Sequence, residues 1–194
     1  MIDIRELKQK ASVFKETTLS PKIEFVDSIN FSNVRKKGLQ SVKEVKEFSG
    51  NWKAIKKNDK LLIQIDNIVD GLDDEVSVPS TGWTWHTHPK GCPNIDDCSI
   101  IPPSANDFEV FAERHEDQHM VISEKRIYWV KALRKYSTVE VKLIYEFYKK
   151  LEEFFDDNSI SHDEFDEIFA LASKFGNFFK IYRFENKDVV IVND

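Results

Sequence analysis

Two histidines in a strand-like segment have the type and spacing of metal ligands. His86 and His88 lie two residues apart in the run Trp-Thr-Trp-His-Thr-His-Pro of residues 83–89. In a β-strand this spacing directs both imidazoles to the same face of the sheet. Pro89 cannot donate a ladder hydrogen bond, so we expect the strand to end there, with the two histidines at its carboxyl end. Two nitrogen ligands of a Zn²⁺ site are thereby in place.

A helix start further along the chain offers the third ligand. Pro102-Pro103-Ser104 is followed three residues later by Asp107, which predicts Ser104 near the N-cap of a helix over 105–114 and Asp107 in its first turn. Two histidines and one carboxylate leave the fourth tetrahedral position for water. This is the arrangement of a catalytic zinc site, in contrast to the closed shell of a structural one.

The order of these parts resembles a known family. His86-x-His88-Pro89, a loop and Ser104-x-x-Asp107 are similar to the motif of the JAMM/MPN+ zinc metallopeptidases, which remove ubiquitin and ubiquitin-like proteins. The resemblance extends over residues 22–135. It implies an α/β (α+β) fold of the cytidine-deaminase-like type, a mixed sheet flanked by helices. It also implies Zn²⁺ as the cofactor, hydrolysis of an amide or isopeptide bond, and a ubiquitin or ubiquitin-like conjugate as the substrate.

The resemblance further implies two catalytic side chains. In the family a glutamate in a Glu-x-x-Gly pattern is the general base, and Glu47-Phe-Ser-Gly50 matches that pattern. Glu44 is the alternative base, although it has no glycine three residues later. The hydroxyl of Ser104 would donate a hydrogen bond to the oxyanion of the tetrahedral intermediate.

The surrounding sequence predicts the elements that hold these residues. Hydrophobic spacing predicts a helix over 31–43, and two strand patterns over 44–55 and 61–69 predict an antiparallel pair beside the histidine strand. A further strand is expected over 22–27, and a hairpin over 119–132 after the Asp107 helix.

The C-terminal third is predicted to be a helical extension. A single apolar stripe, with Ser161-x-x-Glu164 as a later helix start, predicts two helices, and a hairpin of 178–184 with 189–192 follows. The stripe consists of Val141, Ile144, Tyr148, Leu151 and Phe155. We therefore divide the chain into an N-terminal segment of residues 1–20, a metallopeptidase domain of residues 21–137 and an extension of residues 138–194.

Two other functional classes compete with this interpretation. His115-Glu116-Asp-Gln-His119 matches the His-Glu-x-x-His signature of zincin peptidases, but the residues that follow are strand-like, so we predict a surface connection there. The second alternative is a non-catalytic binding or scaffold module of the same family. The presence of His86, His88, Ser104 and Asp107 argues against it, since an inactive member is expected to lack at least one of them.

The composition of the chain limits which classes of partner and which cellular compartment we expect. The 194 residues carry a net charge of -6, which argues against nucleic-acid binding because no basic surface is evident. No apolar stretch approaches the roughly 20 residues of a membrane span, and the start lacks the apolar core of a signal peptide. We expect an intracellular, cytoplasmic protein. Cys92 and Cys98 are then predicted to be thiols in the loop before Ser104, which we expect to shape substrate access without ligating the metal.

Overall fold

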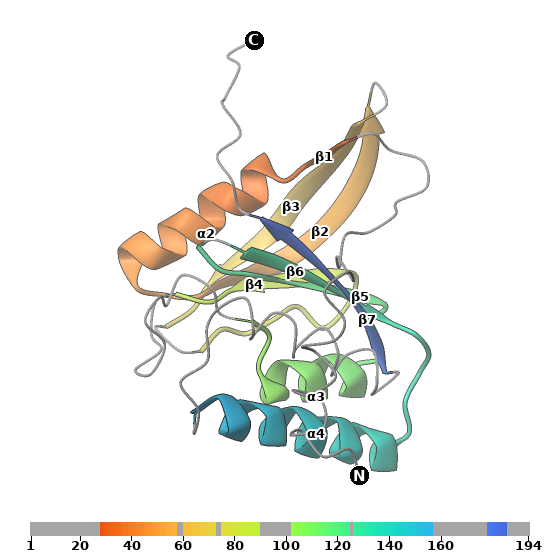
Figure 1. The fold of residues 1–194 in the computed structure, drawn as a ribbon. Helices are drawn as coiled ribbons and strands as arrows, with labels where there is room; N and C mark the ends of the chain where they lie inside the picture. The colour runs from red at the N-terminus through yellow and green to blue at the C-terminus, as the bar shows by residue number, and fades with distance from the viewer. Residues whose placement is uncertain are drawn as a thin grey trace, which may run out of the picture.

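A mixed β-sheet with helices on both faces forms the described part of the chain (Figure 1). The computed structural model describes residues 28–57, 60–72, 75–89, 102–124, 126–156 and 178–185. Its helices are α2 (Ser32–Glu44), α3 (Ala105–Glu113) and α4 (Thr138–Asp156). Its strands are β1 (Ser28–Asn30), β2 (Phe48–Lys57), β3 (Lys60–Asp70), β4 (Thr84–Thr87), β5 (Gln118–Ile122), β6 (Arg126–Ala132) and β7 (Phe179–Glu185). The predicted mixed sheet flanked by helices is confirmed.

The seven strands lie in the order β1-β3-β2-β4-β5-β6-β7. β2 pairs antiparallel with β3 on one side and with β4 on the other, so the predicted hairpin does lie beside the histidine strand. β4 and β5 are parallel, and α3 is part of the connection between them. β5 and β6 form the predicted hairpin, and β7 pairs antiparallel with β6 at the edge.

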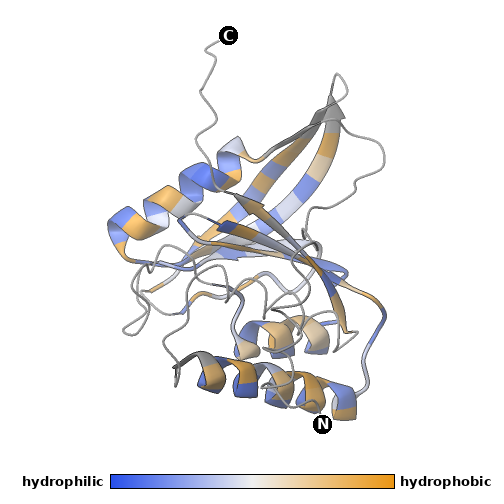
Figure 2. Ribbon diagram, viewed as in Figure 1, coloured by the Kyte–Doolittle hydropathy of each residue, from blue (hydrophilic) through white to orange (hydrophobic). Residues whose placement is uncertain are grey.

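The two faces of the sheet bury different hydrophobic clusters. α2 covers one face, while α3 and α4 lie on the other (Figure 1). Figure 2 shows hydrophobic and hydrophilic residues alternating along α2 and along the strands, as expected for elements with one buried side. The cluster on the α2 side contains Phe31, Val34, Phe48, Trp52, Ile63, Trp85, Met120, Ile122 and Ile127. Because Trp85 faces α2, its strand neighbours face α3.

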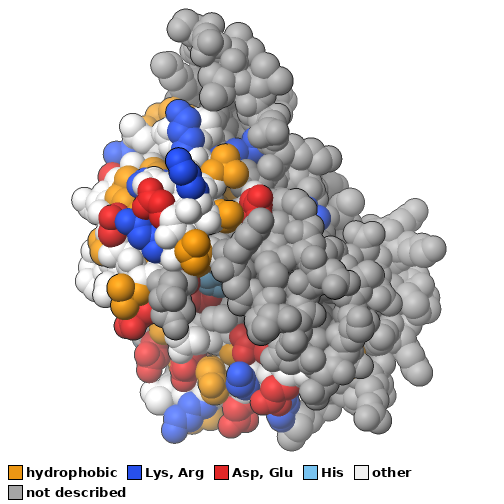
Figure 3. Space-filling model, turned by 90° about the vertical axis from the view of Figure 1, so that its left-hand side faces the viewer, with side chains coloured by type: hydrophobic (Ala, Val, Ile, Leu, Met, Phe, Trp, Pro, Cys, Tyr) orange, Lys and Arg blue, Asp and Glu red, His pale blue; other side chains and the backbone are white. Residues whose placement is uncertain are grey.

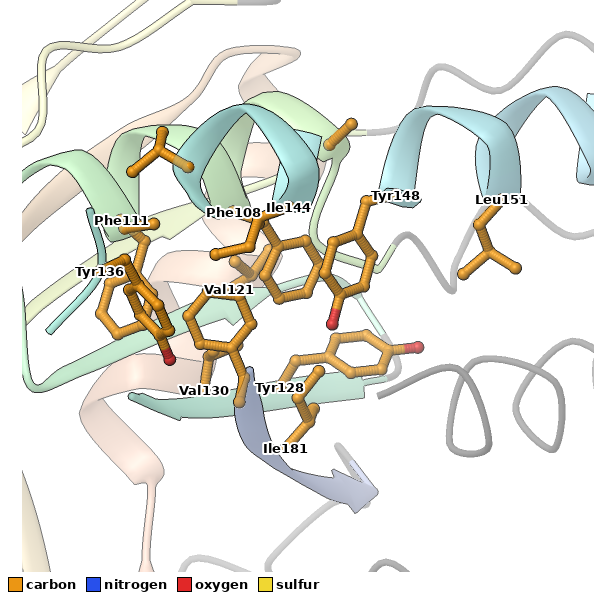
Figure 4. Close-up of a cluster of buried hydrophobic side chains, with 14 residues drawn as sticks. Phe108, Phe111, Val121, Tyr128, Val130, Tyr136, Ile144, Tyr148, Leu151 and Ile181 are labelled. Carbon is orange, nitrogen blue, oxygen red and sulfur yellow. The ribbon is translucent and has the colours of Figure 1, made fainter. Parts of the chain in front are cut away.

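The second cluster joins α3, α4 and the sheet. In Figure 4 Phe108 of α3 lies beside Ile144 and Tyr148 of α4, above the strand residues, and Phe111 belongs to the same cluster. The rings of Phe108 and Tyr148 are stacked with centroids 3.6 Å apart and an angle of 13° between their planes. The helix predicted from the apolar stripe is thus present as α4. It holds α3 against the sheet through this stack.

The boundary that the sequence suggested at residue 137 falls inside this core. Val141, Ile144 and Phe179 are buried in the same cluster as Phe108, and β7 belongs to the same sheet as β4. No helix among the described residues is long and apolar enough to span a membrane.

Several expectations lie outside the described residues. They are the segment 1–20, the strand 22–27, the cysteine-bearing loop, the helix begun by Ser161 and the strand 189–192. The short strand β1 was not predicted from the sequence. It pairs in parallel with β3 over Ser28 to Asn30.

Candidate metal centre

Three side chains converge at the carboxyl end of β4. His86 Nε2 lies 2.9 Å from His88 Nε2 and 3.1 Å from Asp107 Oδ1. His88 Nε2 lies 3.3 Å from Asp107 Oδ2. One ligand atom from each residue lies within 4.8 Å of the others, and this is the one such group among the residues that the structure describes. The three residues singled out as metal ligands are therefore brought together, and they could hold a metal ion.

Strand pairing explains why both histidines reach this point. His86 pairs with Ser49 of β2 and with Val121 of β5, so it lies within the sheet. Its side chain is buried. The N–H of His88 donates to the Ile122 carbonyl at 2.9 Å, which carries the alignment with β5 one step beyond the last residue of β4. Proline follows at position 89, where the chain leaves the strand.

A capping box at the start of α3 fixes the aspartate. Ser104 is the N-cap residue: its hydroxyl oxygen accepts the Asp107 N–H at 3.1 Å, and its own N–H donates to Asp107 Oδ2 at 2.6 Å. The predicted helix start is confirmed. The backbone N–H of Ala105, the first residue of α3, donates a hydrogen bond to Glu152 Oε1 of α4 at 2.6 Å. The first turn of α3 is thus anchored by side chains from two elements.

The electrostatics of the triad favour an ionised carboxylate. Burial alone would raise the pKa of Asp107, but the charge attraction of His86 and hydrogen bonds from His86 and His88 hold it well below its usual value. Capping hydrogen bonds from Ser104 also favour the charged form. An ionised Asp107 facing two imidazole nitrogens is a suitable donor set for a divalent cation.

The chemistry of the donors fits zinc. Two imidazole nitrogens and a carboxylate oxygen are ligands that Zn²⁺ takes in open, catalytic sites. His88 Nδ1 is buried and has no hydrogen-bond partner among the described residues, whereas His86 Nδ1 contacts His119 Nε2 at 2.8 Å. Comparison with known protein families, with curated proteins and with solved structures gives no match.

Glu47 directly precedes β2. Phe48 is buried on the α2 side, so Ser49, the next residue of β2, faces the side of α3. Ser49 pairs with His86 in the last pair of the β2–β4 ladder, and Glu47 lies two residues before Ser49. Its backbone is fixed by hydrogen bonds from the Glu47 N–H to Leu72 O at 2.6 Å and from the Gly71 N–H to Glu47 O at 2.9 Å.

Close packing around Gly50, the glycine of the Glu-x-x-Gly pattern, excludes a side chain at that position. A Cβ atom added to Gly50 would lie 2.6 Å from the Asp66 carbonyl oxygen and 2.8 Å from the Trp85 indole nitrogen. Only glycine leaves room for this close approach between β2, β3 and β4. Glu44, the alternative base, ends α2, and its carboxylate contacts Gln40 at 2.7 Å and Lys46 at 3.0 Å.

Glu116 and His119 were predicted to lie on the surface, and that prediction is wrong. Both are buried, with 7% and 6% of their surface exposed, while His115 is exposed and adopts a left-handed φ of 53°. The chain turns at His115, directly after α3, and His119 lies in β5. The two histidines are therefore not one helical turn apart, and the zincin arrangement is not formed.

The strand pattern after the turn contained the missed signal. His119 lies two residues before Val121 in β5, so the two side chains share one face of the sheet. Val121 is buried on the α3 side, and His119 therefore faces that side too. Burial lowers the pKa of the His119 imidazole, and this outweighs the nearby Glu116 carboxylate, which would raise it.

A pocket leads from the solvent to this site. Its volume is about 430 Å³, and its walls are the segment 75–78, α3 and the side chains of His86, Asp107, Glu116 and His119. Arg114 Nη1 donates to the carbonyls of Val78 at 2.9 Å and Pro79 at 3.2 Å, which ties this segment to the end of α3. Figure 3 shows histidine and acidic atoms at the bottom of a hollow on the face turned to the viewer.

Proposed function

We propose that the chain is a zinc-dependent metallopeptidase of the JAMM/MPN+ type. The observation that carries this proposal is the convergence of His86, His88 and Asp107, with the aspartate set by the Ser104 capping box. The order of the four residues along the chain is that of the family motif. Glu47 lies two residues before Ser49, which pairs with His86, and this further supports the proposal.

The roles of the side chains follow from their chemistry. His86, His88 and Asp107 would hold Zn²⁺, which supplies a water of lowered pKa and a Lewis acid for the substrate carbonyl. Glu47 accepts a proton from the attacking water and returns it to the leaving amine. Both transfers use one carboxylate, since the proton taken in the first step is the one given in the second.

Ser104 has a single hydroxyl proton for two uses. Its Oγ lies 2.8 Å from Asp107 Oδ2. In the proposed reaction the hydroxyl turns from Asp107 to the substrate and donates to the oxyanion, a contribution of about 3 kcal/mol. The backbone N–H of Ser104 still donates to Asp107, so the carboxylate keeps a partner.

The proposed substrate is an amide or isopeptide bond of a ubiquitin or ubiquitin-like conjugate. The test combines zinc analysis of the purified protein with cleavage of ubiquitin chains and of ubiquitin-like fusions. We expect one zinc per chain and release of the leaving amine, both lost in an Asp107→Ala variant. Zinc binding together with conjugate binding but no cleavage would instead favour a non-catalytic module, and a protein without zinc affinity would refute the proposal.

A further inference from the structure

We propose that His119, Thr84 and Glu116 form a buried relay that holds His86 in its metal-binding tautomer. The inference rests on the proposed metal site for its purpose, but the arrangement of its protons can be tested without metal. The three residues lie behind His86 as seen from the metal ligands. They include two of the residues that the sequence alone assigned to the surface.

The relay is continuous at hydrogen-bond distances. His86 Nδ1 lies 2.8 Å from His119 Nε2, and His119 Nδ1 lies 2.6 Å from Thr84 Oγ1. Thr84 Oγ1 lies 2.5 Å from Glu116 Oε2. His86 Nε2, at the other side of the same ring, faces His88 and Asp107. His119 and Thr84 thus connect the proposed ligand His86 with the buried carboxylate of Glu116.

Strand pairing fixes the positions of these side chains. Thr84 is the direct partner of His119 in the parallel β4–β5 ladder, and His86 is the next residue of β4 on the same face. Thr84 is fully buried, and Glu116 and His119 are also buried. Arg114 Nη1 lies 3.9 Å from Glu116 Oε1, so a cation faces the buried carboxylate.

The carboxylate sets the direction of every hydrogen bond in the relay. The Thr84 hydroxyl donates its one proton to Glu116 Oε2. Thr84 Oγ1 can then only accept, and His119 must donate to it from Nδ1. An imidazole that binds a metal through Nε2 carries its proton on Nδ1, so His86 Nδ1 donates a hydrogen bond to His119 Nε2, and His119 carries its own proton on Nδ1.

The consequence falls on His86. Because its Nδ1 is engaged with His119, Nε2 is the nitrogen of His86 that is left to bind a metal, and it is the atom that faces His88 and Asp107. The relay therefore selects the one tautomer that can bind a metal at that point. Such outer partners orient a ligand and raise its basicity, and their loss typically weakens metal binding roughly 10-fold to 100-fold. His119, Thr84 and Glu116 are positioning residues, since none of them is a metal ligand.

The first test reads the relay directly. Long-range ¹H–¹⁵N spectra of the metal-free parent protein should show a neutral His119 that carries its proton on Nδ1. In Glu116→Gln the new amide can donate to Thr84, so the direction is no longer fixed, and His119 should shift toward the Nε2-protonated form. An Nε2-protonated His119 in the parent protein would overturn the proposal, whether or not the protein binds zinc.

The second test reads the effect on the metal. Zinc affinity, measured by chelator competition, should fall roughly 10-fold to 100-fold in Glu116→Gln and Thr84→Val. Thr84→Ser keeps the hydroxyl and should retain an affinity close to that of the parent, as should His115→Ala on the exposed turn. Equal affinities in Thr84→Val and Thr84→Ser would refute the relay. A parent protein that binds no zinc but shows the predicted His119 tautomer would refute the proposed function and leave the relay established.

Discussion

The hydroxyl of Ser104 and the carboxylate of Asp107 hold each other at the start of α3, with Ser104 Oγ 3.1 Å from the Asp107 N–H and 2.8 Å from Asp107 Oδ2. The same local arrangement recurs at the start of α4. There Ser137 Oγ lies 3.4 Å from the Glu140 N–H and 2.9 Å from Glu140 Oε2. Only the first of these two capping boxes faces the histidines, so the second provides a matched control.

Replacing Ser104 by alanine should separate its capping role from its role at the metal. Ser104→Ala and Ser137→Ala should each lower the free energy of unfolding by about 1 kcal/mol, since each removes one N-cap acceptor. Only Ser104→Ala should also weaken zinc binding, because only Asp107 is a proposed ligand. Urea unfolding and chelator competition measure the two effects. An equal loss of zinc affinity in both variants would mean that helix stability alone controls the site.

Zinc content should depend on His86 and be independent of His115. His86→Ala removes an imidazole nitrogen from the convergent group and should leave the purified protein without zinc. His115→Ala alters an exposed side chain on the turn after α3 and should keep one zinc per chain. Metal analysis after dialysis distinguishes the two results. The reverse pattern would move the metal site to the segment around His115.

Removing the proposed base should abolish turnover without removing the metal. Glu47→Gln keeps the size of the side chain but cannot accept the proton, so activity on a cleavable conjugate should fall by about 10²-fold to 10⁴-fold. Zinc content and the thermal unfolding midpoint should match those of the parent. Glu44→Gln is the control, since Glu44 contacts Gln40 and Lys46. Normal turnover in Glu47→Gln with an inactive Glu44→Gln would assign the base to Glu44.

Stability at acid pH should depend on Glu140. Hydrogen bonds from Arg134 and from Ser137 lower the pKa of Glu140 from 4.5 to about 2. A carboxyl whose pKa is lower in the folded state stabilises the fold above its unfolded pKa and loses that contribution as the pH falls. The stability difference between the parent and Glu140→Gln should therefore be constant above pH 5 and shrink as the pH falls from about 4.5 to about 2. A difference in unfolding free energy that does not change over this range would contradict the shift.

The ring stack between α3 and α4 should contribute to the stability of the fold. Phe108 follows Asp107 directly and is 1% exposed against Tyr148. Phe108→Ala should lower the unfolding free energy by about 3 to 5 kcal/mol through lost burial and a cavity. Phe108→Leu fills more of the space and should lose less. Chemical denaturation of both variants measures this order, and equal losses would show that the cavity is not the cause.

The convergence of the three candidate ligands could be predicted because their signals are local. A two-residue spacing, a proline and a serine three residues before an aspartate each depend on the nearest neighbours along the chain. The hairpin of β2 and β3 was predicted for the same reason. Ser104 and Asp107 lie where a capping box must put them.

The relay was missed because its members meet only through strand pairing. Glu116 and His119 occur in a polar string after a helix, which is typical of a surface connection. Their burial depends on the left-handed turn at His115 and on the parallel register of His119 with Thr84. Neither the turn nor the register has a strong sequence signal. The short pairing of β1 with β3 was missed for the same reason.

The pairing of β2 with β4 involves only three residue pairs, Ser49 with His86, Gly50 with Trp85, and Asn51 with Thr84. The proposed metal ligands and the relay all lie within residues 84–122, on β4, α3, β5 and their connections. The proposed base, Glu47, directly precedes β2, on the other side of that short ladder. In the proposed mechanism, metal binding and proton transfer therefore depend on separate segments of the chain that are joined at Gly50. A side chain at position 50 would press on Asp66 of β3 and on Trp85, the neighbour of His86 in β4, so it should disturb the proposed base and the ligand strand together.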